Sequence, residues 1–165
     1  MKRVLSIQDI SCIGKCSLTV ALPIISAMGI ETSILPTSIL STHTMFNDFT
    51  FRDLTDDMEP IKKHWQKEGF SFDAIYTGYL GSEKQITLVK DYFKTFGNTC
   101  KYIIVDPAMA DNGKLYSGFD KDFPLKMAKL CKYADVILPN ISEAAFMTGM
   151  PYPGENASNV LKICF

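Results

Sequence analysis

Three short segments carry polar side chains that could bind a ligand, and each directly follows an apolar run typical of a strand. They comprise residues 77–82, 105–109 and 138–143. If these strands are parallel neighbours, their carboxyl ends meet at one edge of a sheet, which is where open α/β folds bind ligands. The sequence therefore predicts an active-site edge built from these three turns.

Acidic side chains in two of these turns could hold a metal ion. Asp106 precedes Pro107, which biases Asp106 toward extended backbone at the strand end. Glu143 falls in the first turn of a helix expected to begin near Ser142, so it could face Asp106 across a crevice. Two close carboxylates need a cation or a proton, and Mg²⁺ prefers oxygen ligands. The alternatives are a turn-capping Asp and a Glu that only stabilises a helix N-terminus.

Hydroxyl, imidazole and aromatic groups could complete a ligand site. The segment 41–44, Ser-Thr-His-Thr, follows a strand-like run and could bind a polar ring or a hydroxymethyl group. Gly78 and Gly81 flank Tyr79, which would let a ligand approach the backbone beneath an aromatic ring. An ordinary turn is the alternative interpretation of both segments.

Two other motifs are poor candidates for a zinc site and a phosphate-binding loop. Cys12 and Cys16 could bind zinc, but the two histidines of the chain lie far away in sequence. The Gly-Lys pair at 14–15 lacks the spacing of a phosphate-binding P-loop.

Composition predicts a small-molecule binder in the cytoplasm. With 165 residues, 47% of them hydrophobic, the chain can bury one core and is expected to form a single domain. Its net charge of -1, with both signs interspersed, argues against nucleic acid or a membrane surface as partner. No apolar stretch approaches the roughly 18 residues of a membrane span, and the first apolar run is too short for a signal peptide. Five cysteines without a Cys-x-x-Cys pair suit reduced thiols.

Strand-like and helix-like segments alternate, which predicts a parallel sheet with right-handed crossovers. A turn is expected at Pro36, a bend or an early helix end at Pro23, and a capping box between Ser82 and Gln85. The expected strands are 4–8, 32–35, 39–40, 74–77, 102–105 and 136–138. The expected helices are 15–28, one that starts at 56–60 and ends at Gly69, 82–96, 125–131 and one starting at 158–165.

Five motifs, taken in order, resemble the pyridoxal kinase branch of the ribokinase superfamily. They lie at 6–14, 41–44, 77–82, 106–109 and 139–143 and extend over nearly the whole chain. The resemblance implies a ribokinase-like three-layer α/β/α fold with a mainly parallel sheet, of which residues 1–165 would form a single, C-terminally truncated domain. Hydroxymethylpyrimidine kinases are similar in fold and chemistry and are the closest alternative.

The resemblance also implies an activity, cofactors and site residues. The family transfers the γ-phosphoryl group of ATP to the 5'-hydroxymethyl of a vitamin B6 vitamer, with Mg²⁺ and often a monovalent cation such as K⁺, and its members are commonly homodimers. Carried over to this sequence, the vitamer pocket would comprise Asp9, His43, Thr44 and Tyr79. The nucleotide side would comprise Asp106, Asp111, Asn140 and Glu143, with Asp106 and Glu143 at the metal.

The sequence departs from the family pattern in two places. Pyridoxal kinases commonly carry Ser where this chain has Asp9, so a carboxylate could face a cationic aminomethyl group and favour pyridoxamine. The family's Gly-x-Gly-Asp motif, whose Asp is the catalytic base, would lie beyond Phe165. We therefore expect the 165-residue chain alone to be inactive. A truncated fragment that only binds a vitamer is the alternative from another functional class, and a flavodoxin-like phosphate binder is a more distant one.

Overall fold

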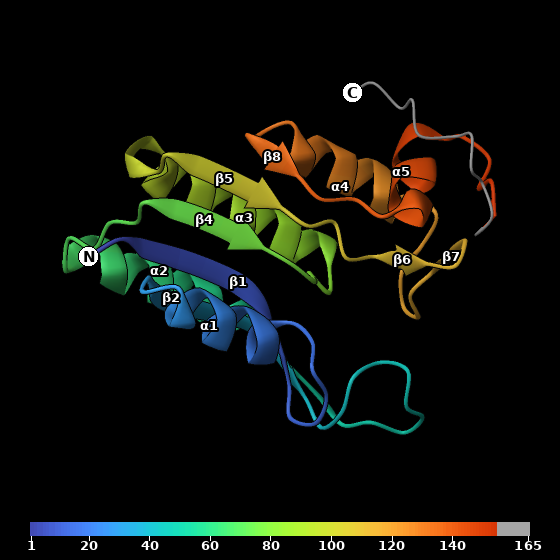
Figure 1. The fold of residues 1–165 in the computed structure, drawn as a ribbon, viewed down its shortest axis with the longest axis horizontal. Helices are drawn as coiled ribbons and strands as arrows, with labels where there is room; N and C mark the ends of the chain where they lie inside the picture. Colours follow the sequence, from blue (N-terminus) through green and yellow to red (C-terminus); the bar gives the residue numbers. More distant parts are fainter. Residues whose placement is uncertain (155–165) are drawn as a thin grey trace.

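The fold centres on a six-stranded sheet, shown by a computed structural model that describes residues 1–154 (Figure 1). The strand order is β3-β2-β1-β4-β5-β8, and all neighbours are parallel except β2 and β3. A separate antiparallel hairpin pairs β6 with β7. The strands are β1 Arg3–Ser11, β2 Glu31–Leu40, β3 Phe51–Asp53, β4 Ala74–Thr77, β5 Tyr102–Val105, β6 Ala110–Asp111, β7 Lys114–Leu115 and β8 Val136–Ile137.

Helices cover both faces of the sheet. Figure 1 shows α1 on the near face, where it packs on β1 and β2, and α3 on the far face. On that far side α3 packs against both α2 and α4, and α4 against α5. The helices are α1 Leu18–Ala27, α2 Thr55–Lys67, α3 Glu83–Phe96, α4 Phe123–Cys131 and α5 Ile141–Thr148, with a 3-10 turn at Gly97–Thr99. The predicted mainly parallel α/β architecture is confirmed.

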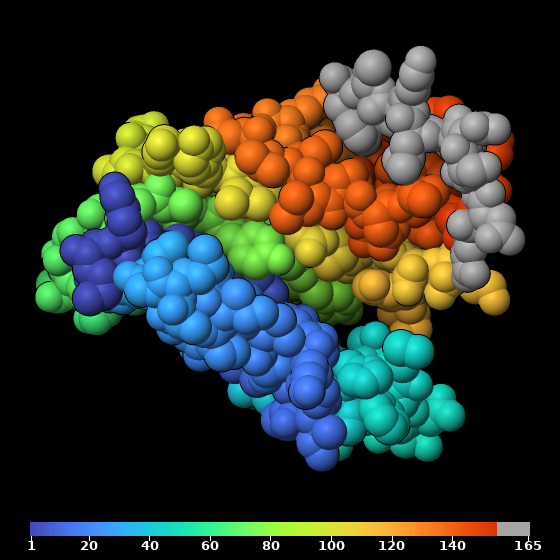
Figure 2. All heavy atoms as spheres, viewed as in Figure 1, coloured from blue at the N-terminus to red at the C-terminus, as the bar shows by residue number. Residues whose placement is uncertain are grey.

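The chain leaves β1 in one direction to β2 and later adds β4 on the other side of β1. The strand order therefore reverses between β1 and β4, and such a switch point is where open α/β sheets form a crevice at the carboxyl ends of the strands. Figures 1 and 2 show the loop between β2 and β3 and the β6–β7 region projecting from the same end of the molecule. The topology thus brings loops from distant parts of the sequence to one edge.

Several predicted boundaries differ from those in the structure. Pro36 lies inside β2 instead of in a turn. It is tolerated there because β3 pairs only with Ser38–Leu40, so that side of β2 has no neighbouring strand at Pro36. Pro23 lies inside α1 without ending it, and this helix begins at Leu18 rather than at residue 15. The short β3 and the β6–β7 hairpin were not predicted, and the helix start expected at 158–165 lies outside the described residues.

The main hydrophobic core lies between the sheet and the helices α2, α3 and α4. Alternate residues of the central strands point into it, as expected for strands with one face on a helical layer. Its fully buried members include Leu5, Ile7, Leu35, Met58, Ile75, Val89, Tyr92, Val105, Met127 and Leu130. Within residues 1–154, none of the helices has the length and apolar character needed to cross a membrane.

Candidate active site

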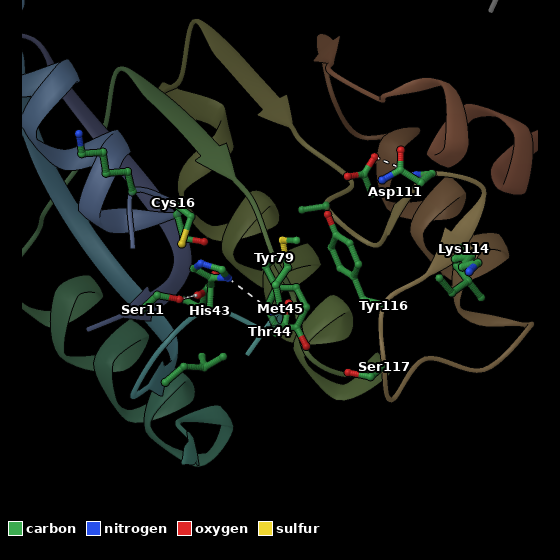
Figure 3. Close-up of a pocket in the computed structure, with 17 residues that line it drawn as sticks. Ser11, Cys16, His43, Thr44, Met45, Tyr79, Asp111, Lys114, Tyr116 and Ser117 are labelled. Atoms are coloured by element: carbon green, nitrogen blue, oxygen red, sulfur yellow. Dashed lines mark hydrogen bonds between the residues drawn. The ribbon is translucent and has the colours of Figure 1, made fainter. Parts of the chain in front are cut away.

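A pocket of about 570 Å³ opens at the carboxyl ends of β1, β2 and β4 (Figure 3). In Figure 3, His43 lies on one side of the cavity and Asp111 on the other, with Tyr79 and Tyr116 between them. Five side chains singled out from the sequence line this pocket, namely Asp9, His43, Thr44, Tyr79 and Asp111. Asp111 was expected on the nucleotide side, and the structure brings it to the same cavity as the four residues expected around the vitamer.

Asp9, near the carboxyl end of β1, places a buried carboxylate in this pocket. Only 5% of the residue is exposed. Its Oδ2 accepts a hydrogen bond of 3.3 Å from the Ser11 hydroxyl, while Oδ1 has no hydrogen-bond partner among the described residues. Burial raises the pKa of Asp9, and the nearby Ser17 and Ser11 hydroxyls offset part of this shift.

His43 and Thr44 come from the loop that follows β2. The His43 ring packs on Phe46 at a centroid distance of 4.8 Å, and its Nδ1 accepts a 3.4 Å hydrogen bond from the Met45 amide. The loop approaches the β1–α1 turn closely, because a Cβ on Gly14 would lie 2.8 Å from the His43 ring. Gly14 also has φ of 128°, a conformation that favours glycine. These contacts hold the imidazole beside the pocket.

Tyr79 follows β4 and is held by both its ring and its backbone. The ring lies 5.6 Å from that of Phe119, and the backbone carbonyl accepts a 3.3 Å hydrogen bond from the Thr37 hydroxyl. Burial raises the pKa of Tyr79, with the charges of Asp9 and Asp53 adding to the shift. The phenol therefore remains a hydrogen-bond donor at neutral pH.

Gln85 anchors the Tyr79 turn from inside the molecule, and this role was not predicted. The Ser82 hydroxyl accepts the Gln85 amide at 3.2 Å, which confirms half of the expected capping box. The Gln85 side chain does not complete that box. Its Oε1 accepts the Gly81 amide at 2.8 Å, and its Nε2 donates to the Thr37 carbonyl and the Thr55 hydroxyl at 3.0 Å each. One buried amide thus links β2, α2 and the turn after β4.

Asp106 lines a second pocket of about 410 Å³ that adjoins the first. The two pockets share Tyr79 and Ala108 among their lining residues. The Asp106 Oδ1 accepts a 3.2 Å hydrogen bond from the Ala108 amide. Burial raises the pKa of Asp106, partly offset by that amide and by the Tyr76 hydroxyl. Asp106 is therefore a carboxylate beside the first pocket rather than in it.

Asn140 and Glu143 line neither pocket, and Asn140 is exposed whereas Glu143 is buried. Asn140 caps α5 and forms a reciprocal capping box with Glu143, so this helix begins at Ile141. The Glu143 Oε2 accepts the Asn140 amide at 2.9 Å and Oε1 accepts the Met109 amide at 3.2 Å. Burial raises the pKa of Glu143 to about 7. The negative charge of Asp106 also raises this pKa, whereas hydrogen bonds from backbone amides lower it. Glu143 is only 2% exposed, and both of its carboxylate oxygens accept hydrogen bonds from backbone amides.

The donor set at this edge fits a cation bound together with a phosphorylated ligand. Within residues 1–154 there is no group of three or more His, Cys, Asp or Glu side chains that could enclose a metal ion. Asp106 offers one carboxylate to a pocket, whereas the Glu143 oxygens already accept backbone amides. Mg²⁺ is commonly held by one or two carboxylates plus phosphates and waters, so a single pocket-facing carboxylate is compatible with it.

The switch-point topology and the two adjoining pockets define an α/β protein with a small-molecule site at the carboxyl edge of its sheet. The sequence model of the phosphomethylpyrimidine kinase family matches residues 31–162, and the chain belongs to this family.

Solved structures of relatives share the fold. A Bacteroides thetaiotaomicron protein described as a phosphomethylpyrimidine kinase, crystallised with pyridoxal, is 45% identical with a TM-score of 0.88, over 92% of this chain and 53% of its own. Pyridoxal kinase from Lactobacillus plantarum is 38% identical with a TM-score of 0.86, over 92% and 54% of the two chains. These likenesses confirm the ribokinase-like fold and the resemblance to pyridoxal kinases.

A pyridoxal kinase is also similar to this chain in sequence. Pyridoxal kinase PdxY from Actinobacillus pleuropneumoniae is 28% identical over 159 residues, which cover 91% of this chain and 54% of the relative. The chain spans about half the length of these relatives.

Proposed function

We propose that the chain is the vitamer-binding half of an ATP-dependent kinase that phosphorylates the 5'-hydroxymethyl group of a vitamin B6 vitamer. The observation that carries the proposal is the convergence of Asp9, His43, Thr44 and Tyr79 on one pocket of about 570 Å³. A cavity of this size accommodates a single substituted pyridine ring. Further support comes from the Bacteroides relative that was crystallised with pyridoxal.

Each pocket side chain has a chemical role in this proposal. Tyr79 supplies an aromatic face and a phenol that donates a hydrogen bond. His43 and Thr44 supply polar contacts to the substituents of the ring. Asp111, on the other side of the cavity, would lie toward the phosphate that is to be transferred.

The nucleotide would bind next to the vitamer, at Asp106 and the turn that follows β5. ATP is expected to bring Mg²⁺, which neutralises the charge of the transferring phosphoryl group when it is bound. Asp106 would provide the oxygen ligand from this chain. Glu143 and Asn140 would keep the turn after β5 in place through the hydrogen bonds of Glu143 to Met109 and of Asn140 to the Ala110 carbonyl. Catalysis would rest on positioning and charge neutralisation.

A hydroxymethylpyrimidine kinase is the second candidate, because the matching family is described as phosphomethylpyrimidine kinase. Both candidate substrates are small aromatic rings with a hydroxymethyl group, so the pocket residues alone do not separate them. The distinction lies in which ring binds more tightly.

Titration calorimetry tests the proposal directly. Pyridoxal and 4-amino-5-hydroxymethyl-2-methylpyrimidine are titrated separately into the purified polypeptide, with a Tyr79→Ala variant as the site control. We expect saturable binding of pyridoxal that is weakened in the variant, and weaker binding of the pyrimidine. Tighter binding of the pyrimidine would favour the second candidate, and no binding of either ring would reject both.

We expect the protein to reside in the cytoplasm and to form a homodimer. The four cysteines that the structure describes are free thiols, which suits the reducing cytoplasm. A homodimer is expected from the resemblance, and sedimentation analysis of the purified protein would measure it. The K⁺ requirement is likewise an expectation, tested by exchanging K⁺ for Na⁺ in an activity assay of the kinase.

A further inference from the structure

We infer that Asp9 selects among B6 vitamers by pairing with a cationic aminomethyl group, so that pyridoxamine is the preferred ligand of this pocket. The inference rests on the proposed function, because it presumes that a B6 ring occupies the cavity. It goes further by assigning a specificity-determining residue and a substrate charge.

The Asp9 carboxylate is buried and only partly satisfied. It is 5% exposed, and one oxygen accepts a hydrogen bond from Ser11 while Oδ1 has no partner among residues 1–154. Asp9 lines the pocket, so a ligand in the cavity would lie against this side chain. A buried polar atom without a partner is costly, and nearly all such atoms in native proteins are satisfied by protein, water or ligand.

The part of the chain that the structure describes provides no counter-ion for this carboxylate. None of its ion pairs includes Asp9. Lys15 lines the same pocket, but its side chain is exposed and forms no ion pair with Asp9. Asp9 and Asp53 both place negative charge near the Tyr79 phenol. A positively charged ligand group would remedy this imbalance.

An ammonium group fits the deficit better than a neutral substituent. A buried carboxylate gains most from a charged donor, because charge-assisted hydrogen bonds are about twice as strong as neutral ones. Pyridoxamine carries a protonated aminomethyl group at neutral pH, whereas pyridoxine carries a neutral hydroxymethyl and pyridoxal a neutral aldehyde at the same ring position. Only pyridoxamine offers a cation there.

The test compares vitamers across charge-removing variants. Pyridoxamine and pyridoxine are titrated by calorimetry into the wild-type polypeptide and into Asp9→Asn and Asp9→Ser. Asp48→Asn serves as the matched control, because Asp48 is exposed and does not line the pocket. Circular dichroism and thermal unfolding of each variant establish that it is folded before it is titrated.

We expect wild type to bind pyridoxamine about tenfold to a hundredfold more tightly than pyridoxine, the range of a charge-assisted hydrogen bond. Both Asp9 variants should lose this preference because pyridoxamine affinity falls by a larger factor than pyridoxine affinity, and the control should stay within about twofold for both vitamers. Without ligand, Asp9→Asn should unfold at a temperature equal to or above that of wild type, because it removes an unpaired buried charge.

Two results would overturn the inference and leave the proposed function intact. One is equal binding of both vitamers by wild type. The other is an equal loss of pyridoxamine and pyridoxine affinity in both Asp9 variants, which would mean that Asp9 contacts the ring or supports the pocket instead of recognising the amine. Failure of wild type to bind any vitamer would reject the proposed function itself, and the inference with it.

Discussion

The backbone amide of Met109 donates a 3.2 Å hydrogen bond to Oε1 of Glu143, which joins the turn after β5 to the first turn of α5. The other oxygen of the same carboxylate accepts the Asn140 amide at 2.9 Å. Glu143 is thus a buried connector between two loops that come from neighbouring strands of the sheet. The turn that carries Asp106 depends on it.

Replacing Glu143 with Ala should lower the free energy of unfolding by about 2 kcal/mol, because buried amides lose their acceptor. Urea denaturation at neutral pH measures the change. Glu68→Ala is the matched control, since Glu68 is exposed at the end of α2, and it should differ from wild type by less than about 0.5 kcal/mol. Equal denaturation midpoints for Glu143→Ala and the control would mean that Glu143 does not anchor the turn.

Asp53 should make the protein more stable at neutral pH than in acid. Partial burial raises the pKa of Asp53, but hydrogen bonds from Thr55 and Gln85 outweigh it and leave the pKa below its ordinary value of 3.8. A lowered folded-state pKa stabilises the fold above the unfolded-state value and is lost as the pH falls through the folded-state value. Asp53→Asn should therefore be less stable than wild type at pH 7, and the difference should shrink below about pH 3.8. A difference that stays constant across this range would contradict the assignment.

Gln85 should govern how well the Tyr79 turn is ordered. Gln85→Leu keeps the side-chain volume but leaves the Gly81 amide and the Thr37 carbonyl without partners. We expect a loss of about 1 to 3 kcal/mol in stability and weaker binding of pyridoxal. Gln66→Leu, an exposed change on α2, is the matched control. Unchanged pyridoxal affinity in a folded Gln85→Leu protein would show that the turn is set by other contacts.

The 165-residue polypeptide should bind a vitamer without phosphorylating it. The resemblance assigns the catalytic base to the Asp of a Gly-x-Gly-Asp motif, and no four-residue segment of the 165-residue sequence matches that pattern. The polypeptide is incubated with Mg-ATP and each vitamer, and phosphorylated product is sought by chromatography. Product formed by material shown to be free of host kinases would refute this prediction.

Much of the fold could be predicted from the sequence because hydrophobic patterning is a local signal. The predicted strands 74–77 and 102–105 coincide with β4 and β5, and both lie in the centre of the sheet where apolar runs are continuous. The turn expected at Pro36 failed because a proline is tolerated on an unpaired side of a strand, which depends on tertiary context. The β6–β7 hairpin, with two residues per strand, is too short for a periodic signal.

The candidate site was predictable only in part, for a similar reason. The positions of His43 and Tyr79 follow from strand ends meeting at one edge, that of Asp9 was implied by the family resemblance, and all three line the same pocket. The direction in which a carboxylate points is set by its packing and its hydrogen bonds. For this reason Glu143, expected at the crevice, is engaged by the backbone, and Gln85, expected only as a cap, connects three elements.

A crystal structure of this polypeptide with bound pyridoxal would test the central claim most directly, namely that the pocket at the β1–β4 switch point binds the B6 ring. We predict density for the ring in the 570 Å³ pocket, against Tyr79 and within hydrogen-bonding distance of at least one of Asp9, His43 and Thr44. Pyridoxal bound only elsewhere, with this pocket filled by solvent at saturating ligand, would contradict the account.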